Sequence, residues 1–168
     1  MGKTFFIADT HFGHNAIIGY ENRPFADIEE MDEHIIKCWN DTVTADDKVF
    51  IIGDFSMYGR EKTEQICSRL NGHKQLIMGN HDTESPGYYI SCGFETASPY
   101  PIIFDSFWIL SHEPLYINSN MPYANIFGHV HNNPIYSDHS KQSFCVCCER
   151  IAYTPVEFDD IKRKMGLI

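Results

Sequence analysis

Seven side chains of types that bind divalent metals occur in short polar blocks along this chain. The blocks are Asp9-Thr10-His11, Gly53-Asp54, Gly79-Asn80-His81-Asp82, Ser111-His112 and Gly128-His129-Val130-His131. The seven candidate metal ligands within them are Asp9, His11, Asp54, Asn80, His112, His129 and His131. Imidazole suits Zn, Fe or Ni, and carboxylate and amide oxygens suit Mn. Seven such ligands are too many for one ion, so we predict two divalent metal ions that share a bridging carboxylate.

Spacing within the blocks predicts which way the ligands face. In an extended backbone, alternate residues point to the same side of the chain, so Asp9 and His11 should face one site. His129 and His131 should do the same, although a slight turn could send the two imidazoles to different ions. Two ions about 3.5–4 Å apart would clamp a phosphoryl group and activate a bridging water.

The histidine after Asn80 is left free for catalysis. His81 could protonate the leaving oxygen or stabilise charge on the phosphoryl group. Asp82 could orient the His81 imidazole, as carboxylates often do. We therefore predict that His81 and Asp82 are catalytic.

The elements that must position these blocks alternate between strands and helices in the first half of the chain. Helical spacing, a capping Asp27 and an Asn71-Gly72 stop predict two helices, and apolar runs predict the strands. In chain order we expect a strand at 3–8, a helix at 28–39, a strand at 48–52, a helix at 61–70 and a strand at 75–78. Such alternation implies right-handed crossovers and parallel strands. Ligands of open α/β sheets collect beyond the carboxyl ends of the strands, where these blocks fall.

The second half of the chain predicts shorter connections and more antiparallel pairing. We expect strands at 101–104, 107–110, 125–127 and 144–148, and a closing helix at 156–165. Asp105-Ser106 reads as a hairpin turn. The class predicted is α/β, with parallel strands first and more antiparallel ones later.

Length and net charge exclude some classes of function. The chain has 168 residues, so a single domain over 1–168 is expected. The formal net charge of −10 opposes binding to duplex nucleic acid or an anionic membrane. A small anionic substrate remains compatible, because bound cations would invert the local field. The sequence lacks an apolar membrane span and a signal-peptide pattern, so we expect a cytoplasmic protein.

Six cysteines are present, and three of them cluster in Cys145-Val146-Cys147-Cys148. The cluster could be half of a zinc site, but a second cysteine pair at zinc spacing is missing. We interpret it as part of a buried strand in which cysteine acts as a small apolar side chain. The thiols should then be reduced.

The ordered blocks resemble the calcineurin-like metallophosphoesterase superfamily, and the resemblance spans most of the chain. It implies a four-layered α/β/β/α sandwich with mixed sheets. It also implies that one metal takes Asp9, His11, Asp54 and His131, and that the other takes Asp54, Asn80, His112 and His129. Asp54 would then bridge the ions, and His81 matches the family's catalytic histidine. Mn²⁺ is the expected metal, with Fe, Zn, Ni or Co as alternatives.

The stretch from Asp9 to His14, with Asn22-Arg23-Pro24-Phe25, resembles a small bacterial and phage branch of uncharacterised phosphoesterases. His14 could contact phosphoryl oxygens, or it could be a loop histidine bonded to the backbone. Arg23 could bind phosphate through two parallel hydrogen bonds, or it could pack its own loop. Both residues are candidates for binding the substrate phosphate.

The function predicted is a metal-dependent phosphoesterase acting on small phosphodiesters or phosphomonoesters. Phe55-Ser56-Met57-Tyr58 follows Asp54 where protein Ser/Thr phosphatases carry a second acidic residue and an arginine, which argues against that activity. A nuclease or cyclic-nucleotide phosphodiesterase is an alternative, although the charge of −10 disfavours long nucleic acids. A non-catalytic scaffold with the same fold is another, but the ligand set and His81 are retained.

Overall fold

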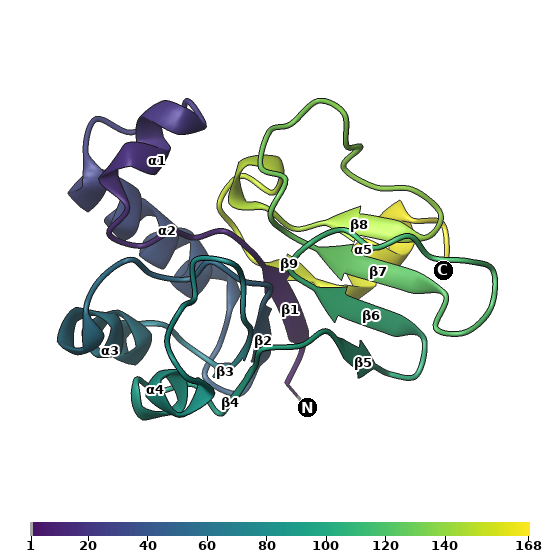
Figure 1. Cartoon of the computed structure of the whole chain (residues 1–168), viewed down its shortest axis with the longest axis horizontal. Coiled ribbons are helices and arrows are strands. Elements are labelled where there is room, and N and C mark those ends of the chain that lie inside the picture. The colour runs from purple at the N-terminus through teal and green to yellow at the C-terminus, as the bar shows by residue number, and fades with distance from the viewer. Residues whose placement is uncertain (1) are drawn as a thin grey trace.

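Apolar runs in the first half of the chain build a mostly parallel sheet. The computed structural model describes residues 2–168, and this sheet has the strand order β4-β3-β2-β1-β9 (Figure 1). Its strands are β1 (Thr4–Ile7), β2 (Lys48–Ile51), β3 (His73–Ile77), β4 (Thr96–Ser98) and β9 (Val156–Glu157). β1 to β4 pair in parallel, and β9 pairs antiparallel with β1. The predicted parallel core is confirmed.

A second sheet has the order β5-β6-β7-β8. Its strands are β5 (Ile102–Phe104), β6 (Trp108–Ser111), β7 (Ala124–Phe127) and β8 (Ser143–Cys145). Asp105 and Ser106 join β5 to β6 with positive φ angles of 49° and 55°, so the predicted hairpin turn is confirmed. β5–β6 is antiparallel, as is β1–β9, so the expected antiparallel pairs do involve later strands, whereas β6–β7 and β7–β8 are parallel.

Five α-helices accompany the sheets: α1 (Asn15–Tyr20), α2 (Ile28–Thr42), α3 (Arg60–Arg69), α4 (Pro86–Ser91) and α5 (Phe158–Lys164). The cap at Asp27 is as predicted, because its side chain accepts a hydrogen bond from the Glu30 N–H. Buried faces of α2, α3 and α4 pack on one side of the first sheet. The side chains between the two sheets form a separate apolar cluster, to which α5 contributes Ile161 and Met165.

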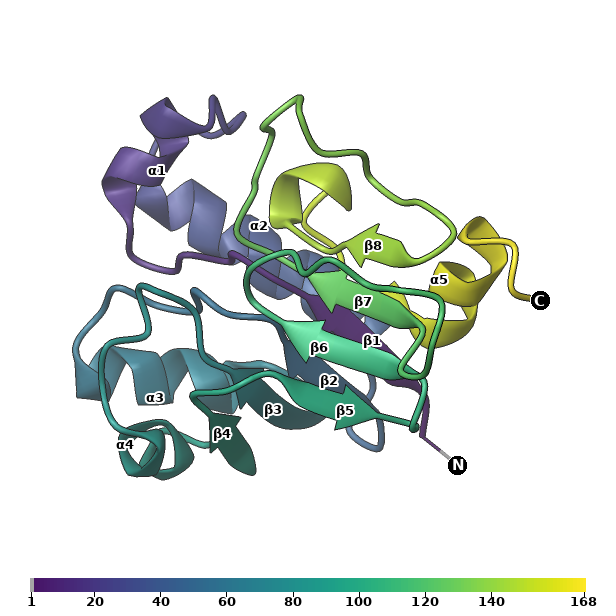
Figure 2. The ribbon, with the colours of Figure 1, turned by 45° about the vertical axis from the view of Figure 1, so that its right-hand side comes forward.

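The layers follow from these contacts: helices, the first sheet, the second sheet, then the irregular segment 112–123 (Figure 2). Asn125 of β7 is fully buried on the outer face of the second sheet, where its Oδ1 accepts from the Leu115 N–H at 2.9 Å. The layered α/β sandwich with mixed sheets is therefore confirmed. Within residues 2–168 its fourth layer consists largely of this segment rather than of a long helix.

The chain's end departs from the predicted elements in two places. Val156 and Glu157 were expected to begin a helix, but they pair with Phe6 and Phe5 as β9. The strand expected over 144–148 ends at Cys145, and Cys148–Arg150 forms a 3₁₀ turn. Cys145, Cys147 and Cys148 are buried, and all six cysteines are free thiols.

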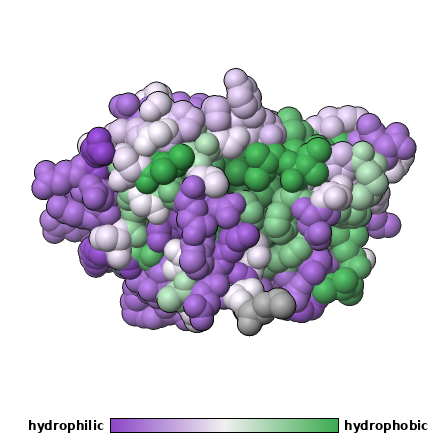
Figure 3. All heavy atoms as spheres, turned by 90° about the horizontal axis from the view of Figure 1, so that it is seen from below, coloured by the Kyte–Doolittle hydropathy of each residue, from purple (hydrophilic) through white to green (hydrophobic). Residues whose placement is uncertain are grey.

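The surface differs between the two halves of the molecule. Figure 3 shows hydrophilic side chains over the helical side and apolar patches toward the side of the second sheet, where Ile103 of β5 is exposed. Among the helices of the described chain, residues 2–168, none has the length and apolarity needed to cross a bilayer.

Candidate metal centre

Loops at the carboxyl ends of five strands bring the predicted ligands together. Asp9 follows β1, Asp54 follows β2 and Asn80 follows β3 in the first sheet. His112 follows β6, and the His129/His131 block follows β7 in the second sheet. A bridge between Ala8 and Cys147 joins the two sheets beside this edge. The expectation that every block lies beyond a strand is confirmed.

Four candidate ligands form a first group. His11 Nε2 lies 3.5 Å from Asp54 Oδ2 and 3.9 Å from Asp9 Oδ1. His131 Nε2 lies 3.7 Å from the same Asp9 oxygen. Ligand atoms about 2.0–2.2 Å from a common ion are separated by distances of this order. The four side chains are therefore spaced as ligands of one ion would be.

Four candidate ligands form a second group, again with Asp54. His112 Nε2 lies 3.0 Å from Asn80 Oδ1 and 3.5 Å from Asp54 Oδ2. His129 Nδ1 lies 3.0 Å from the Asn80 oxygen and 3.2 Å from His112 Nε2. One oxygen, Asp54 Oδ2, is thus equally distant from a histidine of each group.

Unsatisfied buried atoms show that these residues fit a cation. Asp9 Oδ1 and His11 Nε2 are buried and have no hydrogen-bond partner within the described residues 2–168. Each such atom costs roughly 1–3 kcal/mol when nothing compensates it. Ligand atoms of Asp9, His11 and His131, and of Asp9, Asp54 and His112, lie within 4.8 Å of one another. A cation in the first group would satisfy both of these unpaired atoms.

The backbone at the ligands is strained. Five of the seven have a positive φ: Asp9 (58°), His11 (51°), Asp54 (55°), His129 (70°) and His131 (45°). Left-handed backbone costs non-glycine residues about 1–2 kcal/mol each and concentrates at functional sites. The expectation that Asp9 and His11 lie in extended backbone was wrong. The turn anticipated between His129 and His131 is present, and it sends the two imidazoles to different groups.

Glycines make room for this crowding. A Cβ on Gly79 would stand 2.3 Å from Asp54 Oδ1, and one on Gly53 would stand 2.1 Å from His112 Nδ1. The glycines before Asp54 and Asn80 therefore also leave space for side chains from neighbouring strands: His112 packs against the backbone of Gly53, and Asp54 against that of Gly79.

Hydrogen bonds fix the orientation of the His112 ring. His112 Nδ1 donates to the Ile52 carbonyl oxygen at 2.9 Å, which turns Nε2 toward the site. Burial lowers the pKa of His112, but the hydrogen bond with Asp54 and the charges of Asp9 and Asp54 outweigh it and raise that pKa to about 9. Metal-free protein therefore holds a proton at Nε2 at pH 7.

Metal binding should compete with that proton. We expect affinity for Mn²⁺ to rise from pH 6.5 to about 9 and then level off, with proton release on binding. The pKa is raised above its unfolded value of 6.5, so the stabilisation of metal-free protein is complete below pH 6.5 and is lost as pH rises through 9. Calorimetry in buffers of different ionisation enthalpy, with melting curves in chelator, checks both trends. Binding without proton release at pH 7 would contradict this.

Glu149, which no local pattern in the sequence indicated, orients the candidate ligand His131. His131 Nδ1 lies 3.0 Å from Glu149 Oε1, in a hydrogen bond that turns Nε2 toward Asp9. Arg23 donates to the same carboxylate from Nε at 2.8 Å and contacts it with a terminal nitrogen at 2.7 Å. Burial opposes ionisation of Glu149, but His131 and Arg23 lower its pKa to about 2.

Arg23 also holds the first ligand loop. Its guanidinium donates to the carbonyl oxygens of Asp9 at 2.6 Å and Thr10 at 3.1 Å. The side chain is completely buried. This placement favours the loop-packing alternative for Arg23 over direct binding of a phosphate.

Glu149→Gln should weaken metal binding by about 10–100-fold, the usual effect of losing a partner that orients a ligand. The glutamine keeps the size of the side chain but loses the charge that Arg23 and His131 share. Equilibrium titration with Mn²⁺ measures the loss. Glu157→Gln removes an ion pair with Lys3, which lies at the opposite end of β1 from Asp9, and is the control. Equal affinities for Mn²⁺ in wild type and Glu149→Gln would contradict the proposal that Glu149 orients His131.

Asp82 is placed differently from the prediction. Its buried carboxylate accepts the backbone N–H groups of Gly79 at 2.8 Å, Asp54 at 2.7 Å and Phe55 at 3.1 Å. Burial raises its pKa to about 6. With both oxygens bonded to backbone, Asp82 holds two ligand loops together instead of orienting the His81 ring.

His81 and His14 stand beside the first ligand group. The His81 ring centroid is 5.4 Å from that of His11, and the His81 N–H donates to Asp54 Oδ1 at 2.9 Å. His81 is exposed, as a group that meets substrate must be. His14 Nδ1 lies 3.2 Å from His11 Nδ1 and can orient that ligand. The His14 ring is 5.9 Å from His81, so it borders the same space.

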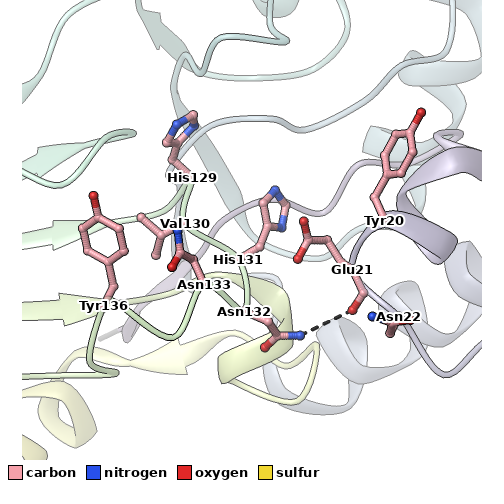
Figure 4. A pocket seen from close by; sticks show the side chains of 9 residues that line it. All are labelled: Tyr20, Glu21, Asn22, His129, Val130, His131, Asn132, Asn133 and Tyr136. Carbon is pink, nitrogen blue, oxygen red and sulfur yellow. Dashed lines mark hydrogen bonds between the residues drawn. The ribbon is translucent and has the colours of Figure 1, made fainter.

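A polar cavity adjoins the ligands. It measures about 620 Å³ and is lined by Tyr20, Glu21, Asn22, His129, Val130, His131, Asn132, Asn133 and Tyr136 (Figure 4). His129 and His131 belong to both the ligand groups and the cavity wall. A substrate held here would therefore lie against the candidate metal centre.

Comparison with known proteins gives consistent results. The family model described as calcineurin-like phosphoesterase matches residues 2–164. An uncharacterized protein of Methanocaldococcus jannaschii is 34% identical over 173 residues, which is 95% of this chain and 89% of the relative. The gene 66 protein of Mycobacterium phage L5 is 37% identical over 89 residues, covering 51% of this chain and 42% of that protein.

Two solved structures share the fold. A protein of unknown function from Aquifex aeolicus superposes with a TM-score of 0.77 at 21% identity, covering 98% of this chain and all of its own. A nuclease from Pseudomonas putida gives a TM-score of 0.52 at 22% identity, covering 76% of this chain and 61% of its own. At these identities the likeness is one of architecture.

Proposed function

This chain belongs to the calcineurin-like phosphoesterase family, and we propose that it hydrolyses small phosphodiesters or phosphomonoesters with two divalent metal ions. The family implies metal-dependent hydrolysis of phosphoesters. The number of ions, the class of ester and the residue roles are our proposal.

The observation that carries the proposal is the position of Asp54. Its Oδ2 is 3.5 Å from His11 Nε2 on one side and 3.5 Å from His112 Nε2 on the other. A carboxylate with this placement is suited to serve two cations at once. Bound there, two ions would neutralise phosphoryl oxygens and supply an activated water.

The protein's own groups would supply the proton for the leaving oxygen and position the bridging carboxylate. The exposed His81, next to the ligand Asn80, would give a proton to the leaving oxygen. The His81 backbone N–H keeps Asp54 in place, so the same residue positions the bridge and serves the reaction. The donor set lacks a thiolate, which favours Mn²⁺ and leaves Fe, Zn, Ni and Co as alternatives.

A small substrate fits the surroundings. The cavity beside the ligands is an open hollow of about 620 Å³, within the usual range for small-molecule sites. The net charge of −10 opposes long nucleic acids and anionic membranes as partners.

Hydrolysis of bis-p-nitrophenyl phosphate by metal-reconstituted protein tests the proposal. We expect turnover with Mn²⁺ and binding of two ions per chain, measured by elemental analysis. Protein with two bound ions that turns over no ester with Mn, Ni, Zn, Fe or Co would be a scaffold instead. Cleavage of single-stranded DNA in preference to 2′,3′-cyclic nucleotides and small esters would favour the nuclease alternative.

A further inference from the structure

The cavity beside His129 and His131 has the chemistry of a specificity pocket. We propose that it binds the nucleoside of a nucleotide ester whose single phosphate lies at the metal centre. This rests on the proposed function, because the centre must hold the phosphate. It adds the substrate class: a nucleoside bearing one phosphate, with nucleoside polyphosphates disfavoured.

Two tyrosines supply aromatic surface to this pocket. Tyr20 ends α1 and is 74% exposed, and Tyr136 is 39% exposed. Figure 4 shows them at opposite ends of the pocket, with His131 between them. Both side chains are exposed to solvent, where a base can stack on an aromatic ring.

Hydrogen bonds from Arg150 hold the segment that carries Tyr136 in place. Arg150 donates to the carbonyl oxygens of Asn133 at 2.8 Å and Tyr136 at 2.9 Å, and to that of His131 at 2.5 Å. Asn132 Nδ2 donates to the Glu21 carbonyl oxygen at 3.4 Å and so ties the two walls together. A wall ordered before binding loses less entropy when a ligand arrives.

The charge of the lining residues determines which ligands the pocket excludes. Of its nine lining residues in the described chain, Glu21 is the single acidic one, and lysine and arginine are absent. The Glu21 side chain points toward His131 (Figure 4), and its carboxylate lies within 4.8 Å of ligand atoms of His131 and Glu149. A second phosphate placed here would meet this negative group without a cation to pair with. Hydroxyl and amino groups would instead find Glu21 and the carboxamides of Asn22, Asn132 and Asn133.

Equilibrium binding separates these features. With Mn²⁺-loaded protein, calorimetry should show adenosine 5′-monophosphate binding more tightly than both inorganic phosphate and adenosine 5′-diphosphate, with both nucleotides supplied as methylene-phosphonate analogues that the protein cannot hydrolyse. Tyr136→Ala should weaken binding of the monophosphate by roughly tenfold, the scale of one lost base–aromatic stack, and leave phosphate binding unchanged. Tyr116→Ala, at a 98% exposed tyrosine of segment 112–123, is the matched control and should change neither.

Glu21→Gln tests the charge argument. Removing the carboxylate should improve diphosphate binding by about tenfold relative to the monophosphate, the scale of one charge pair a few ångströms apart that solvent largely screens. Equal effects of Tyr136→Ala on monophosphate and phosphate, or a wild type that prefers the diphosphate, would overturn the pocket's role.

The proposed function is judged separately, by turnover of bis-p-nitrophenyl phosphate. Monophosphate binding that depends on Tyr136 in a protein without turnover would support the pocket and overturn the hydrolase. Turnover with equal affinities for the monophosphate, the diphosphate and inorganic phosphate would support the hydrolase and overturn the pocket.

Discussion

Asp54→Asn should abolish binding of both metal ions and lower turnover by about 10³-fold or more. Asp54 Oδ2 faces His11 and His112 at 3.5 Å each, so the loss of one charge is felt by both ligand groups. Burial opposes ionisation of this carboxyl, yet its hydrogen bond and Coulomb interaction with His112 lower its pKa to about 2, so it is charged at neutral pH. Two ions supply several kcal/mol of transition-state stabilisation, which sets the size of the loss.

Asp47→Asn is the matched control. Asp47 precedes β2, at the end of the strand opposite to Asp54, and its buried carboxylate also accepts backbone N–H groups, from Lys3 and Thr44. This variant should lose some stability and keep its metal content. Elemental analysis and turnover on both variants give the answer. Two ions retained in Asp54→Asn would exclude a bridging role.

His81→Ala should keep both metal ions and lower turnover by ~10²–10⁴-fold, the usual contribution of general acid catalysis. The side chain is exposed at the centre, and its own backbone N–H, which survives the substitution, is the group that holds Asp54. The defect should be largest for esters with poor leaving groups, which need the proton most. Activated p-nitrophenyl esters should lose less.

His73→Ala is the control for this variant. His73 begins β3, whose other end leads to His81, and its ring forms an exposed hydrogen bond with the side chain of Glu95. Metal content by elemental analysis, with kcat for two leaving groups, separates the two histidines. Loss of metal from His81→Ala would make His81 a ligand and end its assignment as an acid.

The sequence predicted where the candidate ligands meet, because the signals that place them are local. Each ligand block follows an apolar strand, and parallel strands must present their carboxyl ends at one edge. The long helix α2 was equally readable, because Asp27, its acidic first turn and its apolar period agree. Where local preferences point the same way as the fold, reading the chain alone is enough.

What escaped prediction depends on contacts between distant parts of the chain. Glu149 meets Arg23 across 126 residues, and neither position has a local pattern that reveals the pair. Val156 and Glu157 join β1 as β9, overriding a helical reading. α4 was missed despite a signal, since Ser85 caps it and Pro86 stands in its first turn.

If the five candidate ligands with left-handed backbone bind metal as proposed, metal supply becomes a determinant of the protein's lifetime. If each residue costs about 1–2 kcal/mol, their sum is comparable with the net stability of a domain of ordinary size. Bound ions favour the folded state by mass action and would offset that cost. In a metal-starved cell the chain should therefore spend more time unfolded and be degraded faster. Abundance would then track the availability of the metal, with no dedicated sensor needed.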